Sequence, residues 1–383
     1  MSASSRRALF AALGLWAALA AELRAAAPGD DGRDLVILDE DWNVPGDAIC
    51  ESNLPMLLTA PGVRLLALTG VTGDAWCAEG TANALRFLEE VGRPEIPVAR
   101  GATWPLLNTP ARLGAWEARF GPLSWRGAWN SRAQEKGDPH PDTPFAIRPA
   151  REGLPVHAPA AESAPALMVR LVHAYPGRVT LVCGGPLTNV ALAARMDPEF
   201  SRQARRLVLG LSVGGALSGH PASAKPNFNE MFDPEAAHIV LTAGWNELVV
   251  IDTAGAEPSL TADIVNRIQR HATAASNYLV ANGKLGLPLW AQHVAIVADP
   301  SLVTGSDRVT ARLDIQLDDR SPDFGRTILA RAAFYAGPAG GQPVTWVYGV
   351  DTPRYIGRYV EALQSPLMRP RAPEFADGIY PQR

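Results

Sequence analysis

Short apolar runs alternate with longer amphipathic stretches along most of the chain. The run DLVILDED at residues 34–41 and a second run at residues 63–74 both end in polar side chains. After them, residues 77–92 carry apolar side chains at the spacing of an amphipathic helix. Such alternation of strand and helix predicts an α/β fold, with an open, mostly parallel sheet covered by helices on both faces.

The same pattern predicts the remaining elements. Further strands are expected at residues 96–102, 179–185, 205–215 and 246–253. Further helices are expected at residues 46–62, 186–196, 233–244 and 260–284. The C-terminal part, residues 308–383, adds strands at residues 308–317 and 343–350 and a helix at residues 352–364. We interpret residues 33–383 as a single domain.

Residues 101–160 break the alternation. They are rich in Pro, Trp and Gly, as in TWPLLNTPARLGAWEARFGPLSWRGAWN. A long, irregular, aromatic-rich insertion in an α/β domain is typical of a lid or a pocket wall. The alternative is a structural loop that packs its own tryptophans together.

The first 28 residues have the pattern of a targeting segment. Arg6 and Arg7 precede an apolar run, and small residues follow it in LRAAAPGDDG, as in a cleaved signal peptide. The stretch SSRRALF also resembles a twin-arginine signal. We therefore expect an exported protein, periplasmic or secreted, with no stable membrane association after cleavage. An uncleaved membrane anchor is the alternative.

Composition narrows the classes of partner. The net charge is −4 and the pI is about 6.0, so nothing indicates a nucleic-acid partner. The three cysteines, Cys50, Cys77 and Cys183, do not have the spacing of a zinc site, and we interpret them as small buried apolar side chains. Neither a G-x-G-x-x-G nor a GK[ST] loop follows a predicted strand, which disfavours a nucleotide-dependent enzyme.

Polar side chains collect where the predicted strands end. Asp39 and Asp41 are two residues apart, so in an extended chain they point the same way and Glu40 points away. Asp47 follows at the start of a helix. Because ligands of open α/β sheets bind beyond the carboxyl ends of the strands, these carboxylates indicate a site.

Three more clusters follow other strands. They are Asp74 with Trp76, the glycine-containing stretch CGGPLTN at residues 183–189, and Asn227 with Asn229 in a segment expected to be extended. Carboxylates and backbone oxygens without Cys or His ligands favour a hard cation, Ca²⁺ or Mg²⁺. Taken singly, Asp47 could instead be a helix N-cap and Asp74 a turn residue.

These motifs together resemble those of the inosine/uridine-preferring nucleoside hydrolases. The stretch LDEDWNVPGDA is similar to the Asp-rich loop that follows the first strand in that family, GPLTN matches a family turn, and NFNEMFDPEAA matches a later segment. The resemblance covers residues 34–303. It implies a hydrolase that cleaves the N-glycosidic bond of ribonucleosides, uses Ca²⁺, and forms a homo-oligomer.

The resemblance also implies roles for individual residues. Asp41 would be a calcium ligand and the general base that takes a proton from the attacking water. Asp47 and Asp39 would supply further carboxylates, and Gly184 would offer its backbone carbonyl to calcium. The implied substrate-binding residues are Asp74, Asn227 and Asn229. Trp76 and Trp290 are proposed as walls against which the nucleobase stacks. For both tryptophans, core packing is the alternative.

The chain departs from the family pattern at three informative positions. Gly46 replaces the first of two paired aspartates, and Asn227 replaces an acidic residue. The Asp that completes the family's calcium site is absent near Ala291. A catalytically impaired protein that binds nucleosides or ribosyl compounds on the same fold is therefore the alternative to an active hydrolase.

Overall fold

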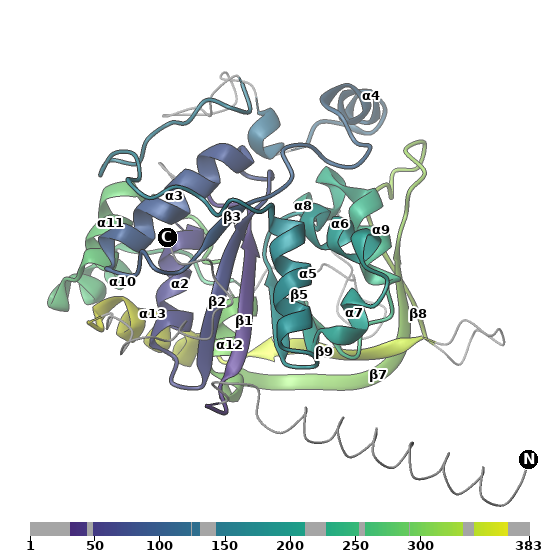
Figure 1. The fold of residues 1–383 in the computed structure, drawn as a ribbon. Coiled ribbons are helices and arrows are strands. Elements are labelled where there is room, and N and C mark those ends of the chain that lie inside the picture. Colours follow the sequence, from purple (N-terminus) through teal and green to yellow (C-terminus); the bar gives the residue numbers. More distant parts are fainter. Residues whose placement is uncertain are drawn as a thin grey trace, which may run out of the picture. The chain divides into compact units, whose positions relative to one another are not determined.

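The strands form one nine-stranded sheet in the order β3-β2-β1-β4-β5-β6-β9-β7-β8, as seen in the computed structural model (Figure 1). Neighbouring strands from β3 to β9 in this order are parallel, and β7 and β8 are antiparallel additions at one edge. The bounds are β1 Asp34–Glu40, β2 Val63–Gly70, β3 Val98–Arg100, β4 Val179–Cys183, β5 Arg206–Gly210, β6 Leu248–Ile251, β7 Val303–Ile315, β8 Thr327–Arg331 and β9 Gln342–Val350.

The structure describes residues 31–43, 49–123, 125–130, 143–210, 227–252, 257–290, 292–331 and 341–366. The helices of these residues are α2 Ile49–Thr59, α3 Cys77–Glu90, α4 Pro110–Phe120, α5 Ala164–Ala174, α6 Thr188–Met196, α7 Phe200–Gln203, α8 Phe228–Phe232, α9 Pro234–Leu241, α10 Ala262–Ile268, α11 Ala274–Asn282, α12 Gln292–Ala298 and α13 Thr352–Gln364. Short 3₁₀ turns are η1 Gly127–Trp129, η2 Gln269–His271 and η3 Pro300–Leu302. The predicted signal peptide, Asp47 and Ala291 lie outside the described residues.

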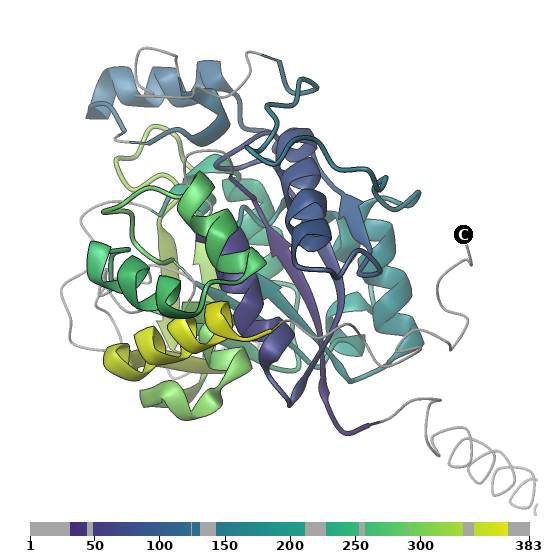
Figure 2. The ribbon, with the colours of Figure 1, turned by 90° about the vertical axis from the view of Figure 1, so that its left-hand side faces the viewer.

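Helices cover both faces of the sheet, as the sequence predicted. Helix α2 packs against α11, α12 and α13 on one face, and Figure 2 shows these helices grouped beside β1 and β2. Helix α6 packs against α5 and α9 on the other face. Every residue of β2 and β4 is buried, as expected for parallel strands that are covered on both sides.

The strand order places a topological switch point between β1 and β4. From β1 the chain adds strands outward to β2 and β3, and it then returns to the other side of β1 to form β4, β5 and β6. At such a switch point the connections leave neighbouring strands toward opposite faces, and a ligand site opens at the carboxyl ends. Asp39 to Asp41 end one of these two strands, and Gly184 follows the other.

Two local predictions were wrong. The helix expected at residues 260–284 is two helices, because Ala272 is extended and Thr273 begins α11 with a capping box that includes Ser276. The segment at residues 227–229, expected to be extended, is the start of α8: Asn227 is its N-cap and Asn229 lies in its first turn.

Residues 101–160 are only partly irregular. They include α4, which Thr109 caps and which has Pro110 at its first position, and the short turn η1. At the C-terminal side, β9 pairs with β6, and β7 pairs with both β9 and β8, so the extra strands extend the main sheet. Among the described helices, none combines the length and apolar character needed to span a membrane.

Candidate active site

Strands β1 and β4 bring the predicted acidic residues and the predicted glycine turn together. Asp39 is level with Thr69 on β2 and with Cys183 on β4. Just beyond the register, the backbone N–H of Gly184 donates to the carbonyl oxygen of Asp39 at 3.0 Å. The carboxyl ends of both strands therefore lie side by side at the switch point of the strand order.

Asp39 is buried and held by two neutral donors. Its Oδ1 atom accepts hydrogen bonds from Thr69 Oγ1 at 2.6 Å and from Asn189 Nδ2 at 2.8 Å. Its Oδ2 atom is buried and has no hydrogen-bond partner among the described residues. Burial raises the pKa of Asp39 to about 7, because the two donors offset only part of the cost of burying the charge.

Asp41 is also buried, and it contacts the turn that follows β2. Its Oδ2 atom accepts a hydrogen bond from the backbone N–H of Asp74 at 2.7 Å. Burial, followed by repulsion from the carboxylates of Asp74 and Glu40, raises the pKa of Asp41 well above its usual range. A Cβ atom at Gly73 would lie 2.1 Å from the same oxygen, so this close approach requires a glycine.

Glu40 points to the opposite face, where sequence reasoning assigned it no role. Its Oε1 atom lies 2.9 Å from Nε2 of His293 on α12, and both residues are buried. A Cβ atom at Gly184 would lie 2.1 Å from Glu40 Oε2, so the carboxylate also lies against the glycine turn. The strand alternation shows that Glu40 turns away from Asp39, but only the fold shows that it meets His293.

Asn229 closes the site from α8. Its Nδ2 atom donates to the carbonyl oxygen of Gly184 at 2.5 Å, and its Oδ1 atom is buried without a partner among the described residues. Asn227 is the helix N-cap, and its Oδ1 atom accepts from the N–H of Asn229 at 2.9 Å. The structure thus places Asn229 at the site and gives Asn227 the role of orienting the helix that carries it.

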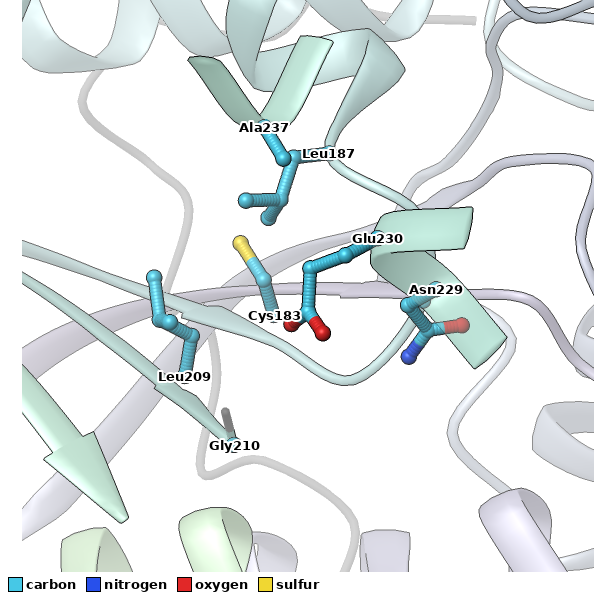
Figure 3. Close-up of a pocket in the computed structure, with 8 residues that line it drawn as sticks. Cys183, Leu187, Leu209, Gly210, Asn229, Glu230 and Ala237 are labelled. Atoms are coloured by element: carbon cyan, nitrogen blue, oxygen red, sulfur yellow. The ribbon is translucent and has the colours of Figure 1, made fainter. Parts of the chain in front are cut away.

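A small pocket beside Asn229 contains an acid that the sequence reasoning missed. The carboxyl group of Glu230 points into this pocket, with Cys183 and Gly210 nearby (Figure 3). Glu230 is buried, its Oε2 atom has no partner among the described residues, and burial followed by repulsion from Asp252 raises its pKa well above the usual range. In the sequence, Glu230 follows Asn227 by three residues, a spacing that places two residues on the same side of a helix and that indicated Glu230 as a neighbour.

The two predicted tryptophan walls differ in exposure. Trp76 is buried in a small cluster with Trp116 and Trp129, and its ring meets that of Trp104 edge to face at 5.2 Å between centroids. Trp290 is 53% exposed and lies two residues before the first residue of α12. Trp76 is thus a buried packing residue and Trp290 is available at the surface, and the role of either as a wall for the nucleobase stays a prediction.

The oxygen atoms at this site have the chemistry of a hard-cation site. Asp39 has a buried oxygen without a partner, Asp41 is crowded by other carboxylates, and Gly184 offers a backbone carbonyl. Within the described ranges, however, no group of three or more His, Cys, Asp or Glu side chains converges on one point. The described residues therefore fit part of a Ca²⁺ site, and the predicted ligand Asp47 lies outside them.

Cys77 and Cys183 are buried free thiols, as predicted. Burial raises the pKa of Cys77 to about 11, which makes it a poor nucleophile near neutral pH. Neither thiol is therefore a candidate for covalent catalysis.

Comparisons with known proteins agree with the geometry. A family model described as inosine-uridine preferring nucleoside hydrolase matches residues 36–357. A protein of Arabidopsis thaliana named probable uridine nucleosidase 2 is 31% identical over 64% of this chain and 68% of its own length. A rice protein named probable uridine nucleosidase 1 is 32% identical over 57% of this chain, and the match spans only 58% of the rice protein.

A solved plant nucleoside hydrolase structure is similar in fold. It superposes with a TM-score of 0.64 over 87% of this chain and 99% of that structure, at 24% sequence identity. At that level of identity the likeness supports the fold alone.

Proposed function

Because the chain belongs to the inosine-uridine preferring nucleoside hydrolase family, we propose that it hydrolyses the N-glycosidic bond of ribonucleosides to ribose and free base. The family resemblance expected from the sequence is thereby confirmed. The observation that carries the proposal is that Asp39 and Asp41 are buried together at the carboxyl ends of β1 and β4, with the backbone N–H of Asp74 bonded to Asp41. A substrate rich in sugar hydroxyls suits such a cluster, since carboxylates accept hydrogen bonds from hydroxyls.

Asp41 is the general base in this proposal. A base is most effective when its pKa lies near the working pH, and the pKa of Asp41 is raised from its ordinary value. The oxygen of a water attacks the anomeric carbon, and a proton of that water passes to Asp41. The C–N bond breaks, its electron pair leaves with the nucleobase, and the nucleobase takes up a proton from solvent, to which Asp41 afterwards releases its own. The N–H of Asp74 keeps the carboxylate of Asp41 in one orientation.

The neighbouring acids stabilise positive charge on the sugar in this proposal. Glycosidic cleavage passes through a state with positive charge on the sugar ring, and nearby carboxylates lower its energy. Asp39 lies two residues before Asp41, with its side chain on the same side of the chain. One of its carboxylate oxygens accepts hydrogen bonds from Thr69 and Asn189. Asp74 lies at the rim beside Asp41. Asn229 is expected to hold the sugar, with its unpartnered Oδ1 atom accepting a hydroxyl hydrogen bond.

We include calcium in the proposal because carboxylate and carbonyl oxygens are the ligands that this ion prefers. Asp41, Asp39, Asp47 and the carbonyl of Gly184 would hold the ion. Bound Ca²⁺ would supply positive charge that keeps the carboxylates ionised and favours the loss of a proton from water. The alternative is a protein that binds nucleosides without turnover, because the Asp that completes the family's calcium site is absent near Ala291.

A reducing-sugar assay separates these functions. The purified protein is mixed with inosine, uridine or adenosine at millimolar calcium, and ribose release is measured; parallel calorimetry measures ribose binding. Release from at least one nucleoside supports the hydrolase. Ribose binding without release from any of the three favours the binding protein and overturns the hydrolase.

Export and self-association stay predictions. We propose that residues 1–28 are removed on export and that the mature protein forms a homo-oligomer that acts on small-molecule nucleosides. Sequencing the N-terminus of protein recovered from the periplasm or medium tests export: a start near residue 28 supports it, and an intact Met1 contradicts it. Sedimentation analysis tests the oligomer, which a purely monomeric species would contradict.

A further inference from the structure

The insertion that follows β3 contacts the turn that holds Asp74. The backbone N–H of Ala128 on η1 donates to the carbonyl oxygen of Gly73 at 2.8 Å. Gly127 has a φ of 57°, and a Cβ atom there would lie 2.1 Å from that carbonyl oxygen. The turn and the insertion therefore approach so closely that position 127 requires a glycine.

A second contact reaches the side chain of Asp74 itself. The indole Nε1–H of Trp125 donates to Asp74 Oδ1 at 2.5 Å. The backbone N–H of the same Asp74 donates to Asp41 Oδ2 at 2.7 Å. A tryptophan of the insertion is thus connected by two successive hydrogen bonds to the proposed general base.

The insertion is also fixed on its other side. The ring of Trp129 packs on Phe232, with 4.3 Å between the ring centroids. Phe232 is the last residue of α8, the helix that carries Asn229. Because η1 contacts both the Gly73 turn and α8, the backbone that presents Trp125 is anchored on both sides of the site.

Electrostatics explain why Asp74 needs such a donor. The carboxylates of Asp41 and Asp74 repel each other, since each raises the cost of the other's charge. The N–H of Asp74 bonds to Asp41, and the carbonyl of the preceding Gly73 accepts from Ala128, but neither of these two backbone bonds sets the rotation of the Asp74 side chain. A donor on a rigid ring opposes that rotation at little cost in side-chain entropy.

We propose that Trp125 is a positioning residue whose indole N–H orients the carboxylate of Asp74 toward the sugar hydroxyls of the substrate. The proposal rests on the proposed hydrolase function. It gives part of the Trp-rich insertion a specific role in recognising the sugar. Trp125 is 37% exposed, so its replacement by phenylalanine leaves the core intact.

Kinetics of Trp125→Phe test the proposal, because phenylalanine keeps an aromatic ring and removes only the donor. We expect KM for the best nucleoside to rise about 10-fold, the loss typical of one hydrogen bond to a charged group, with kcat within about twofold. A variant that merely loses folded enzyme would show a lower kcat at unchanged KM. An unchanged KM in Trp125→Phe overturns the proposal.

A double-mutant cycle adds a sharper criterion. If Trp125 acts through Asp74, then Trp125→Phe has no further effect on KM in an Asp74→Ala background. Effects that multiply in the double variant contradict the proposal. Trp116→Phe is the matched control, since it removes an indole bond to the carbonyl of Ser321, away from Asp74, and we expect its KM to match the wild type.

Failure of the proposed function is distinguishable from failure of this inference. A wild-type protein that releases no ribose overturns the hydrolase and the role of Trp125 with it. An active wild type with an unchanged KM in Trp125→Phe overturns the inference alone. Thermal unfolding of the same four cycle proteins measures the Trp125–Asp74 contact without any activity, and additive shifts in Tm would show that the contact is absent.

Discussion

The two faces of the end of β1 hold acids in different ways. On the face toward α6, the hydrogen bonds that Asp39 and Asp41 accept from side chains and backbone of the described residues come from neutral donors, namely Thr69, Asn189 and the N–H of Asp74. On the face toward α12, Glu40 pairs with His293 at 2.9 Å. Three consecutive acids in the sequence are therefore split by strand alternation into two different environments.

The difference indicates which face performs chemistry. Neutral donors offset only part of the free-energy cost of burying an ionised carboxylate, and a positive charge nearby would offset more of that cost. The α6 face is thus prepared for the positive charge of a glycosidic transition state or a cation. On the α12 face, the carboxylate of Glu40 already has the imidazole of His293 as its partner, and this contact connects β1 to α12. This comparison predicts catalytic effects on the first face and stability effects on the second.

The largest expected effect is from Asp41→Asn, which keeps the shape of the side chain and removes the base. We expect kcat to fall by about 10³-fold, within the range that general base catalysis contributes. Asp307→Asn, at an exposed position on β7, is the matched control and should be as active as the wild type. Turnover within threefold of the wild type in Asp41→Asn would assign the base elsewhere.

The second effect concerns the α12 face. His293→Ala leaves the buried carboxylate of Glu40 without its partner, which should lower the free energy of unfolding by roughly 3 kcal/mol. Chemical denaturation measures this loss, and His271→Ala, at an exposed position, should cost less than about 0.5 kcal/mol. A His293→Ala variant as stable as the wild type would show that the Glu40–His293 contact contributes nothing.

The sequence predicted the sheet well. Parallel strands give continuous apolar runs, and polar residues follow directly, so the strand ends that carry Asp39, Asp41 and Gly184 could be located from the sequence, while the roles of these residues stay predictions. Contacts between distant segments could not be predicted in this way. Glu40 and His293 are separated by 253 residues, and Trp125 and Asp74 by 51, so only the fold brings them together. The division of the predicted helix at residues 260–284 depended on the capping box that begins α11 at Thr273.

The third effect asks whether the α6 face binds a cation. Calorimetry should detect Ca²⁺ binding to the wild type, and Ala291→Asp, which restores the family's carboxylate, should bind it roughly 10- to 100-fold more tightly. Ala291→Asn, which adds similar bulk without charge, is the control. Equal calcium affinity in all three proteins would contradict the predicted alignment of this position.

The smallest effect concerns pH. The pKa of Glu230 is raised in the folded state, so its contribution to stability is present at low pH and is lost as pH rises above its unfolded value of 4.5. Glu230→Gln mimics the protonated acid, so it should exceed the wild type in stability at pH 8 and match it near pH 4. Glu361→Gln, at an exposed position on α13, should show no such difference. A constant difference between Glu230→Gln and the wild type across this range would contradict the assigned titration.

A crystal structure of Asp41→Asn with uridine or inosine bound tests the central claim most directly. The account predicts an intact nucleoside at the carboxyl ends of β1 and β4. Its sugar hydroxyls should lie within hydrogen-bonding distance of Asp74 and Asn229, and its anomeric carbon should face position 41. A nucleoside bound elsewhere, or ribose and free base in place of the intact substrate, would contradict it.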